Sequence, residues 1–194
     1  SLATTILTYN ERTCNILKTW GVKSNIEPIY NSLGPKIIPN LTNLENTIIK
    51  KTKTCNILFL GRVTDIKRLD IICEAVTILK KSYPFVNLQI IGNVLKGSKK
   101  INCKVQDGIY NEKKIRDLFE WASVTVSPGN IGLLALNSIR NSTPIISHNN
   151  FMNQMPEYEI LIEGVTGFSF AEGDSLSLAS IIKKEFILKE FKIT

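Results

Sequence analysis

The chain has 194 residues, 43% of them hydrophobic and 21% charged, with 24 Lys and Arg against 17 Asp and Glu. This length predicts one domain, or one domain with a piece of another attached. The apolar fraction excludes a wholly disordered chain, and no apolar run reaches the ~20 residues that span a bilayer. Thr4, Thr5, Thr8 and Asn10 interrupt the first apolar stretch, so a secretion signal is not expected there.

The formal charge of +7 fits an anionic partner such as nucleic acid, acidic lipid or a nucleotide phosphate, or else an evenly basic surface. Many basic residues come in pairs such as Lys80-Lys81. There is no arginine-rich tract and no basic patch interleaved with aromatic residues, so nucleic acid is not expected as a partner.

The cysteines are Cys14, Cys55, Cys73 and Cys103, and no two of them form a CxxC pair. A zinc site is therefore not expected. Cys55 and Cys73 adjoin apolar runs and are expected to be ordinary core thiols. A reduced, cytoplasmic compartment is the simplest inference.

The first part of the chain predicts one helix and one short extended segment. Asn10 is a candidate N-cap for a helix over 11–20, with Gly21 as its stop. A short extended segment follows over 26–30. Residues 35–54 then bring prolines, asparagines and lysines, a composition typical of a linker.

Beyond the linker, short apolar runs alternate with amphipathic segments. The apolar runs predict strands at 56–61, 86–91, 101–105, 122–126, 144–147 and 167–170. The amphipathic segments predict helices over 69–79, after the cap Asn111, over 131–139 and after the cap Asp174. This alternation predicts an α/β fold with a Rossmann-like, doubly wound parallel sheet.

Ligands of such sheets bind at the carboxyl ends of the strands. Gly61 and Arg62 end the first predicted strand of the α/β unit, and Lys67 lies just before the next helix. Two cations converging there could hold a diphosphate through charged hydrogen bonds. The alternative is an ordinary solvated turn.

Residues 127–133 form a second candidate end, with Gly129 and Gly132 before a predicted helix. Small residues let the backbone approach a ligand, and the helix start favours an anion such as phosphate.

The third candidate end carries His148, the sole histidine of the sequence. A catalytic base would need a nucleophile, and no G-x-S-x-G elbow is present, so His148 is expected to be a polar residue at a loop mouth. Glu157 and Glu159 are not expected to act as an acid/base pair, and no metal-binding cluster is expected.

Several elements in a fixed order carry a family resemblance. They are Gly61-Arg62 with Lys67, then 124–133 with Thr143-Pro144, then 164–168 and Glu172-Gly173-Asp174. They resemble the G-R-x-x-x-x-K, P-S…G-L…G-T-P-V-I, D-G-x-T-G and P-G-D elements of the GT-B fold glycosyltransferases. Residues 56–186 are thus similar to the C-terminal, donor-binding domain of the group-1 (Rfa-type) retaining family.

The resemblance implies a role for each matched residue. Arg62 and Lys67, next to Gly61, would hold the diphosphate of a nucleotide-sugar and stabilise it as the leaving group. Gly132 and Leu133 would offer backbone N–H groups to the donor. Because these groups stabilise the leaving group electrostatically, the resemblance implies that neither a metal nor another cofactor is needed.

The family typically carries two glutamates at the positions of Gly129 and Asn137, and this chain lacks both. Asn137 could still bond a ribose hydroxyl. The run 151–157, Phe-x-x-Gln-Met-Pro-Glu, resembles a capsule- or surface-polysaccharide branch, in which Asn130 is expected to contact the donor sugar. The base would be read near Ile109 and Tyr110.

The resemblance also predicts the organisation. Residues 1–34 would end an acceptor-binding N-terminal domain, 35–54 would link the domains, and 55–194 would bind the donor. The implied activity is transfer from a UDP- or GDP-sugar to a growing surface polysaccharide or lipid-linked glycan, in the cytoplasm or peripherally at the inner membrane face. This part alone is expected to bind nucleotide without turnover.

Two alternatives stay open from the sequence. A nucleotide-sugar epimerase uses the same fold but needs extra carboxylate and histidine catalysts. A non-catalytic nucleotide-binding module would explain the two missing glutamates.

Overall fold

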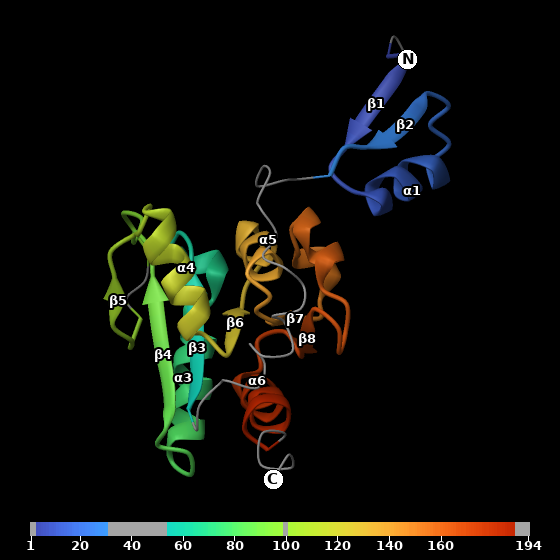
Figure 1. Ribbon diagram of the computed structural model, residues 1–194. Coiled ribbons are helices and arrows are strands. Elements are labelled where there is room, and N and C mark those ends of the chain that lie inside the picture. The colour runs from blue at the N-terminus through green and yellow to red at the C-terminus, as the bar shows by residue number, and fades with distance from the viewer. Residues whose placement is uncertain (1–2, 31–53, 99–100, 189–194) are drawn as a thin grey trace, which may run out of the picture. The chain divides into compact units, whose positions relative to one another are not determined.

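The computed structural model describes residues 3–30, 54–98 and 101–188, and the chain divides into two compact units, Ser1–Pro35 and Lys36–Thr194. Each unit is shown in Figure 1. Apart from Thr54, the expected linker at 35–54 lies outside the described residues, and so does the division between the two units at Pro35 and Lys36.

The first unit is a small β-α-β arrangement. It consists of β1 (Thr5–Thr8), α1 (Glu11–Thr19) and β2 (Asn25–Pro28), and its two strands pair in parallel. Asn10 caps α1 as expected, because its Oδ1 accepts from the Thr13 N–H at 3.0 Å. The helix and the extended segment are confirmed, whereas β1 has no counterpart among the expected elements.

The second unit is built on one parallel sheet, in the order β5-β4-β3-β6-β7-β8. The strands are β3 (Cys55–Leu60), β4 (Val86–Ile91), β5 (Val105–Gln106), β6 (Val124–Ser127), β7 (Ile145–His148) and β8 (Gly167–Phe170). The helices are η2 (Asp65–Lys67), α3 (Leu69–Lys80), α4 (Glu112–Trp121), α5 (Leu133–Arg140), η3 (Phe151–Asn153), η4 (Pro156–Ile160), α6 (Ser175–Ile182) and the π-helix η5 (Lys183–Ile187).

The predicted α/β class and doubly wound parallel sheet are confirmed. Three expected elements are displaced. The strand expected at 101–105 is the two-residue β5, which begins at Val105, and the helix expected from Ile131 begins at Leu133. The strand expected at 122–126 is β6, Val124–Ser127.

Strand order reverses between β3 and β6, since the chain runs outward from β3 to β4 and in the other direction from β6 to β7 and β8. Right-handed crossovers therefore place α3 and α5 on opposite faces of the sheet. Such a reversal is a topological switch point, where loops from both halves leave the same edge.

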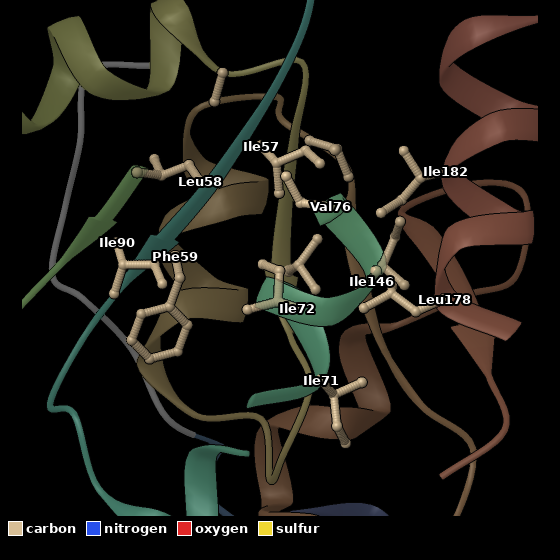
Figure 2. Packing of buried hydrophobic residues seen from close by; sticks show 14 of the residues in the cluster. Ile57, Leu58, Phe59, Ile71, Ile72, Val76, Ile90, Ile146, Leu178 and Ile182 are labelled. Atoms are coloured by element: carbon tan, nitrogen blue, oxygen red, sulfur yellow. The ribbon is translucent and has the colours of Figure 1, made fainter. Parts of the chain in front are cut away.

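The sheet is buried on both faces. Ile57 and Leu58 are neighbours in β3 and point to opposite faces, yet neither is exposed. Figure 2 shows side chains of β3, α3 and α6 gathered in one cluster, and Ile72 and Leu178 within it are also fully buried.

One cysteine prediction is wrong. Cys73 of α3 forms a disulfide with Cys103, whose Cα lies 6.0 Å from its own. The two residues are 30 positions apart, and only the fold brings them together. Cys14 and Cys55 are buried thiols, as expected for Cys55.

Within the described residues, no helix combines the length and apolar character needed to cross a bilayer.

The amino end of β3 carries a buried polar contact. The Asn56 side chain is 8% exposed; its Nδ2 donates to the Trp121 carbonyl at 2.9 Å, and its Oδ1 accepts from Asn87 Nδ2 at 2.9 Å. These bonds join β3 to β4 and to the end of α4, at the edge opposite the switch-point loops.

We expect Asn56→Ala to lower the free energy of unfolding by about 1–3 kcal/mol, because it removes the partner of the Trp121 carbonyl and two partly buried side-chain hydrogen bonds. Urea denaturation measures this. Asn87→Ala is the matched control and should cost less, because it removes the bond to Asn56 Oδ1 but leaves the bond from Asn56 Nδ2 to the Trp121 carbonyl. An equal effect of the two substitutions would contradict the assignment.

Candidate functional site

The candidate site lies where β3 and β6 end at the switch point. β3 leads through Gly61 and Arg62 to η2, and β6 leads through 128–132 to α5. The two strands pair in parallel, with Ile57 opposite Val124, so both connections leave from one edge of the sheet. The first two strand ends chosen from the sequence are therefore neighbours.

Gly129 lies directly on the backbone of η2. Its N–H donates to the Lys67 carbonyl at 2.9 Å. A Cβ added to Gly129 would stand 1.9 Å from the Ile66 carbonyl oxygen and 2.7 Å from the Lys67 carbonyl carbon. Because backbone atoms occupy that space, no side chain fits at this position, and the first glutamate that the resemblance predicts here has no room.

Lys67 is held against the same segment. Its Nζ donates to the Asn130 carbonyl at 2.7 Å and to Asn130 Oδ1 at 2.8 Å. Burial lowers the pKa of Lys67 below the ordinary 10.5, the charge of Arg62 lowers it further, and the charge of Glu157 opposes both. The two cations therefore act on each other, and an anion between them would relieve their repulsion.

The start of α5 completes the arrangement. Gly132 is its N-cap residue, and a Cβ on Gly132 would lie 3.7 Å from Lys67 Nζ. The first N–H groups of a helix have no partner within it, and the helix dipole adds partial positive charge there. The Lys67 ammonium and the N–H groups at Gly132 and Leu133 thus define what we call the anion site.

Asn137 lies one turn into α5. It is partly exposed, and its Nδ2 donates to the Leu133 carbonyl at 3.2 Å. The helix places Asn137 beyond its first turn, so it borders the anion site rather than belonging to it.

Ile109 and Tyr110 follow β5 at the same edge of the sheet. Asn93, just after β4, donates to the Tyr110 hydroxyl at 2.8 Å and accepts from the Gly108 N–H at 3.0 Å. One side chain thus fixes the 108–110 turn, while the Tyr110 ring stays 80% exposed. Asn93 was not among the expected site residues, because only the fold brings it to this turn.

His148 ends β7 and is 2% exposed. Burial lowers the pKa of His148, and the charge of Glu172 partly offsets this. His148 and Asn130 line one groove of about 420 Å³, whose lining includes none of Arg62, Lys67 or Gly132. Among the described residues, no three His, Cys, Asp or Glu side chains gather as a metal site.

Gln154, between η3 and η4, also reaches this segment. Its Oε1 accepts from the Ile131 N–H at 2.7 Å. Gln154 belongs to the 151–157 run, and its role could not be predicted from the sequence because its partner lies 23 residues away.

The sequence model of the glycosyl transferases group 1 family matches residues 42–190. A search of curated protein sequences found no significant match.

Three solved structures illustrate the fold. Sucrose-phosphate synthase from Thermosynechococcus elongatus is 17% identical, with a TM-score of 0.66 over 97% of this chain and 50% of that one. The pneumococcal O-GlcNAc transferase GtfA, in complex with UDP and GlcNAc, is 12% identical, with a TM-score of 0.70 over 98% of this chain and 40% of that one. The C-terminal domain of the group 1 family protein LpcC from Francisella tularensis is 16% identical, with a TM-score of 0.57 over 80% of this chain and 86% of that domain.

These likenesses show the fold of the second unit as that of a GT-B glycosyltransferase C-terminal domain. The chain spans half or less of the first two structures.

The packing of Gly129 gives a direct prediction. We expect Gly129→Ala to destabilise the chain by more than about 2 kcal/mol, because the added methyl group meets backbone that cannot move aside cheaply. Gly129→Glu, which restores the family residue, should cost at least as much. Thermal and urea unfolding measure both.

Asn137→Glu is the matched control, because it restores the second family glutamate on a partly exposed helix position. It should change stability by no more than about 0.5 kcal/mol. A stable Gly129→Glu variant would show that the 128–132 segment does not lie on η2.

Proposed function

Because the chain belongs to the glycosyl transferases group 1 family, we propose that it forms the donor-binding part of an enzyme that transfers a sugar from a nucleotide-sugar. The observation that carries this proposal is the anion site at the switch point. One ammonium group, one helix start and a nearby guanidinium suit the two charges of a diphosphate.

The proposed chemistry is stabilisation of a leaving group. As the bond between the sugar and the diphosphate breaks, negative charge grows on the terminal phosphate oxygen. Lys67, Arg62 and the N–H groups of Gly132 and Leu133 are catalytic in this scheme, because they face that charge. The residues present supply the positive charge that a metal ion would otherwise bring, and we propose metal-free transfer.

The remaining residues border the diphosphate. Asn130 would contact the donor sugar, and its Oδ1 is already anchored by Lys67. Asn137 would bond the ribose, and backbone groups at Ile109 and Tyr110 would read the base. UDP is the first nucleotide to try, because UDP is bound in the structures of GtfA and of Staphylococcus aureus TarM.

Finer features follow the family resemblance. We propose transfer of a hexose with retention of configuration, as in the Rfa-type and capsule branch, with UDP- or GDP-sugar as donor. The acceptor would be a surface polysaccharide or lipid-linked glycan, held by a part of the protein beyond this chain. The place of action would be the bacterial cytoplasm, or the inner membrane face.

One observation favours a second candidate, a nucleotide-binding module without activity. The backbone under Gly129 leaves no room for a side chain, so the carboxylate that the resemblance predicts beside the donor sugar cannot be supplied from this position. Both candidates require nucleotide binding, and turnover by an enzyme that includes the acceptor-binding part separates them.

Calorimetric titration of the chain with UDP, GDP and ADP tests the proposal. One of these should bind, and Arg62→Ala or Lys67→Ala should each weaken it about 10–100-fold, the value of one charged hydrogen bond. Lys80→Ala, an exposed lysine at the end of α3, is the control and should bind normally. No binding at millimolar nucleotide, or indifference to Arg62 and Lys67, would contradict the proposal.

The lowered pKa of Lys67 predicts a pH dependence. A lysine is charged below its pKa, so Lys67 should lose its charge, and the chain its diphosphate affinity, at a pH below 10.5. Calorimetry at stepwise higher pH measures this. Lys67→Arg keeps its charge throughout and should abolish the fall; a fall that persists in Lys67→Arg would assign it to another group.

A further inference from the structure

Resting on the proposed function, we infer that Gln154 is a positioning residue of the anion site. It acts through the 127–132 segment, which it ties to the end of β7, and so sets where the helix-start N–H groups of α5 point.

Both ends of the Gln154 amide are engaged. Oε1 accepts from the Ile131 N–H at 2.7 Å, and Nε2 donates to Ser147 Oγ at 3.0 Å and to the His148 carbonyl at 2.8 Å. A flipped amide would set its NH₂ group against the Ile131 N–H and its oxygen against the His148 carbonyl. The partners therefore fix one orientation of the amide.

A second tie runs through Ser147. Its Oγ donates to the Ser127 carbonyl at 2.9 Å and approaches the Gly129 carbonyl at 3.4 Å. Ser127 Oγ in turn donates to the Asn130 carbonyl at 3.2 Å, the same oxygen that Lys67 Nζ binds. Gln154, Ser147 and Ser127 thus form one network from β7 to Lys67.

Within this network, Gln154 accepts the hydrogen bond of the Ile131 N–H, which points into the protein. Ile131 is fully buried, so its N–H can reach no water and depends on Gln154. With that N–H held inward, the helix begins two residues later, at Leu133. Gly132 and Leu133 then supply the helix-start N–H groups beside Lys67.

The role of Gln154 differs from that of the charged residues of the anion site. Gln154 bears no charge and does not itself reach the anion site; it acts through backbone groups that it orients. Its loss should therefore weaken binding of the terminal phosphate of a nucleoside diphosphate and spare binding of the base and the first phosphate.

The test compares a nucleoside diphosphate with its monophosphate, using whichever pair binds among UDP/UMP, GDP/GMP and ADP/AMP. Gln154→Met keeps the length of the side chain and removes all three hydrogen bonds. We expect about tenfold weaker diphosphate binding and nearly unchanged monophosphate binding. Ser147→Ala, which removes the second tie, should lower the diphosphate preference in the same direction but less.

Asn56→Ala is the control for stability alone, because it loses buried hydrogen bonds at the opposite edge of the sheet. It should lower the unfolding temperature and leave the ratio of diphosphate to monophosphate affinity unchanged. If Gln154→Met and Ser147→Ala also leave that ratio unchanged while Lys67→Ala lowers it, the role of Gln154 is wrong and the proposed function stands. A chain that binds no nucleotide overturns both.

Discussion

The anion site depends on one backbone contact, between Gly129 and η2. The Gly129 N–H donates to the Lys67 carbonyl, and the space of a side chain is filled by Ile66 and Lys67 backbone. This contact joins the loops of the two halves of the sheet at the switch point. It brings Lys67 to Asn130 and to the start of α5, and it requires glycine at the position where the family resemblance predicts a carboxylate.

Burial of the Lys67 charge beside Arg62 is electrostatically unfavourable, and a bound anion would offset this. A half-buried lysine beside Arg62 is less favourable than a solvated one, as the lowered pKa of Lys67 records. The same loss makes the site receptive to an anion, which restores the balance of charge. The uncharged network around Gln154 ties this backbone to β7, in addition to the two bonds that Lys67 Nζ donates to Asn130.

The sequence predicted the sheet and both strand ends well, because buried parallel strands produce continuous apolar runs and glycines mark their ends. It could not predict the contacts between these ends. Cys73 and Cys103, Gln154 and Ile131, and Asn93 and Tyr110 are each far apart in sequence and meet only in the fold. β5 was misplaced because Ile101 and Cys103 alternate with polar residues as in a half-buried strand, yet pairing with β4 begins only at Val105.

A crystal structure of the chain with the nucleoside diphosphate that it binds would test this arrangement. We expect the terminal phosphate within hydrogen-bond distance of the Gly132 and Leu133 N–H groups and of Lys67 Nζ, with Gly129 still on the η2 backbone. A terminal phosphate bound away from Lys67 and the start of α5 would contradict it.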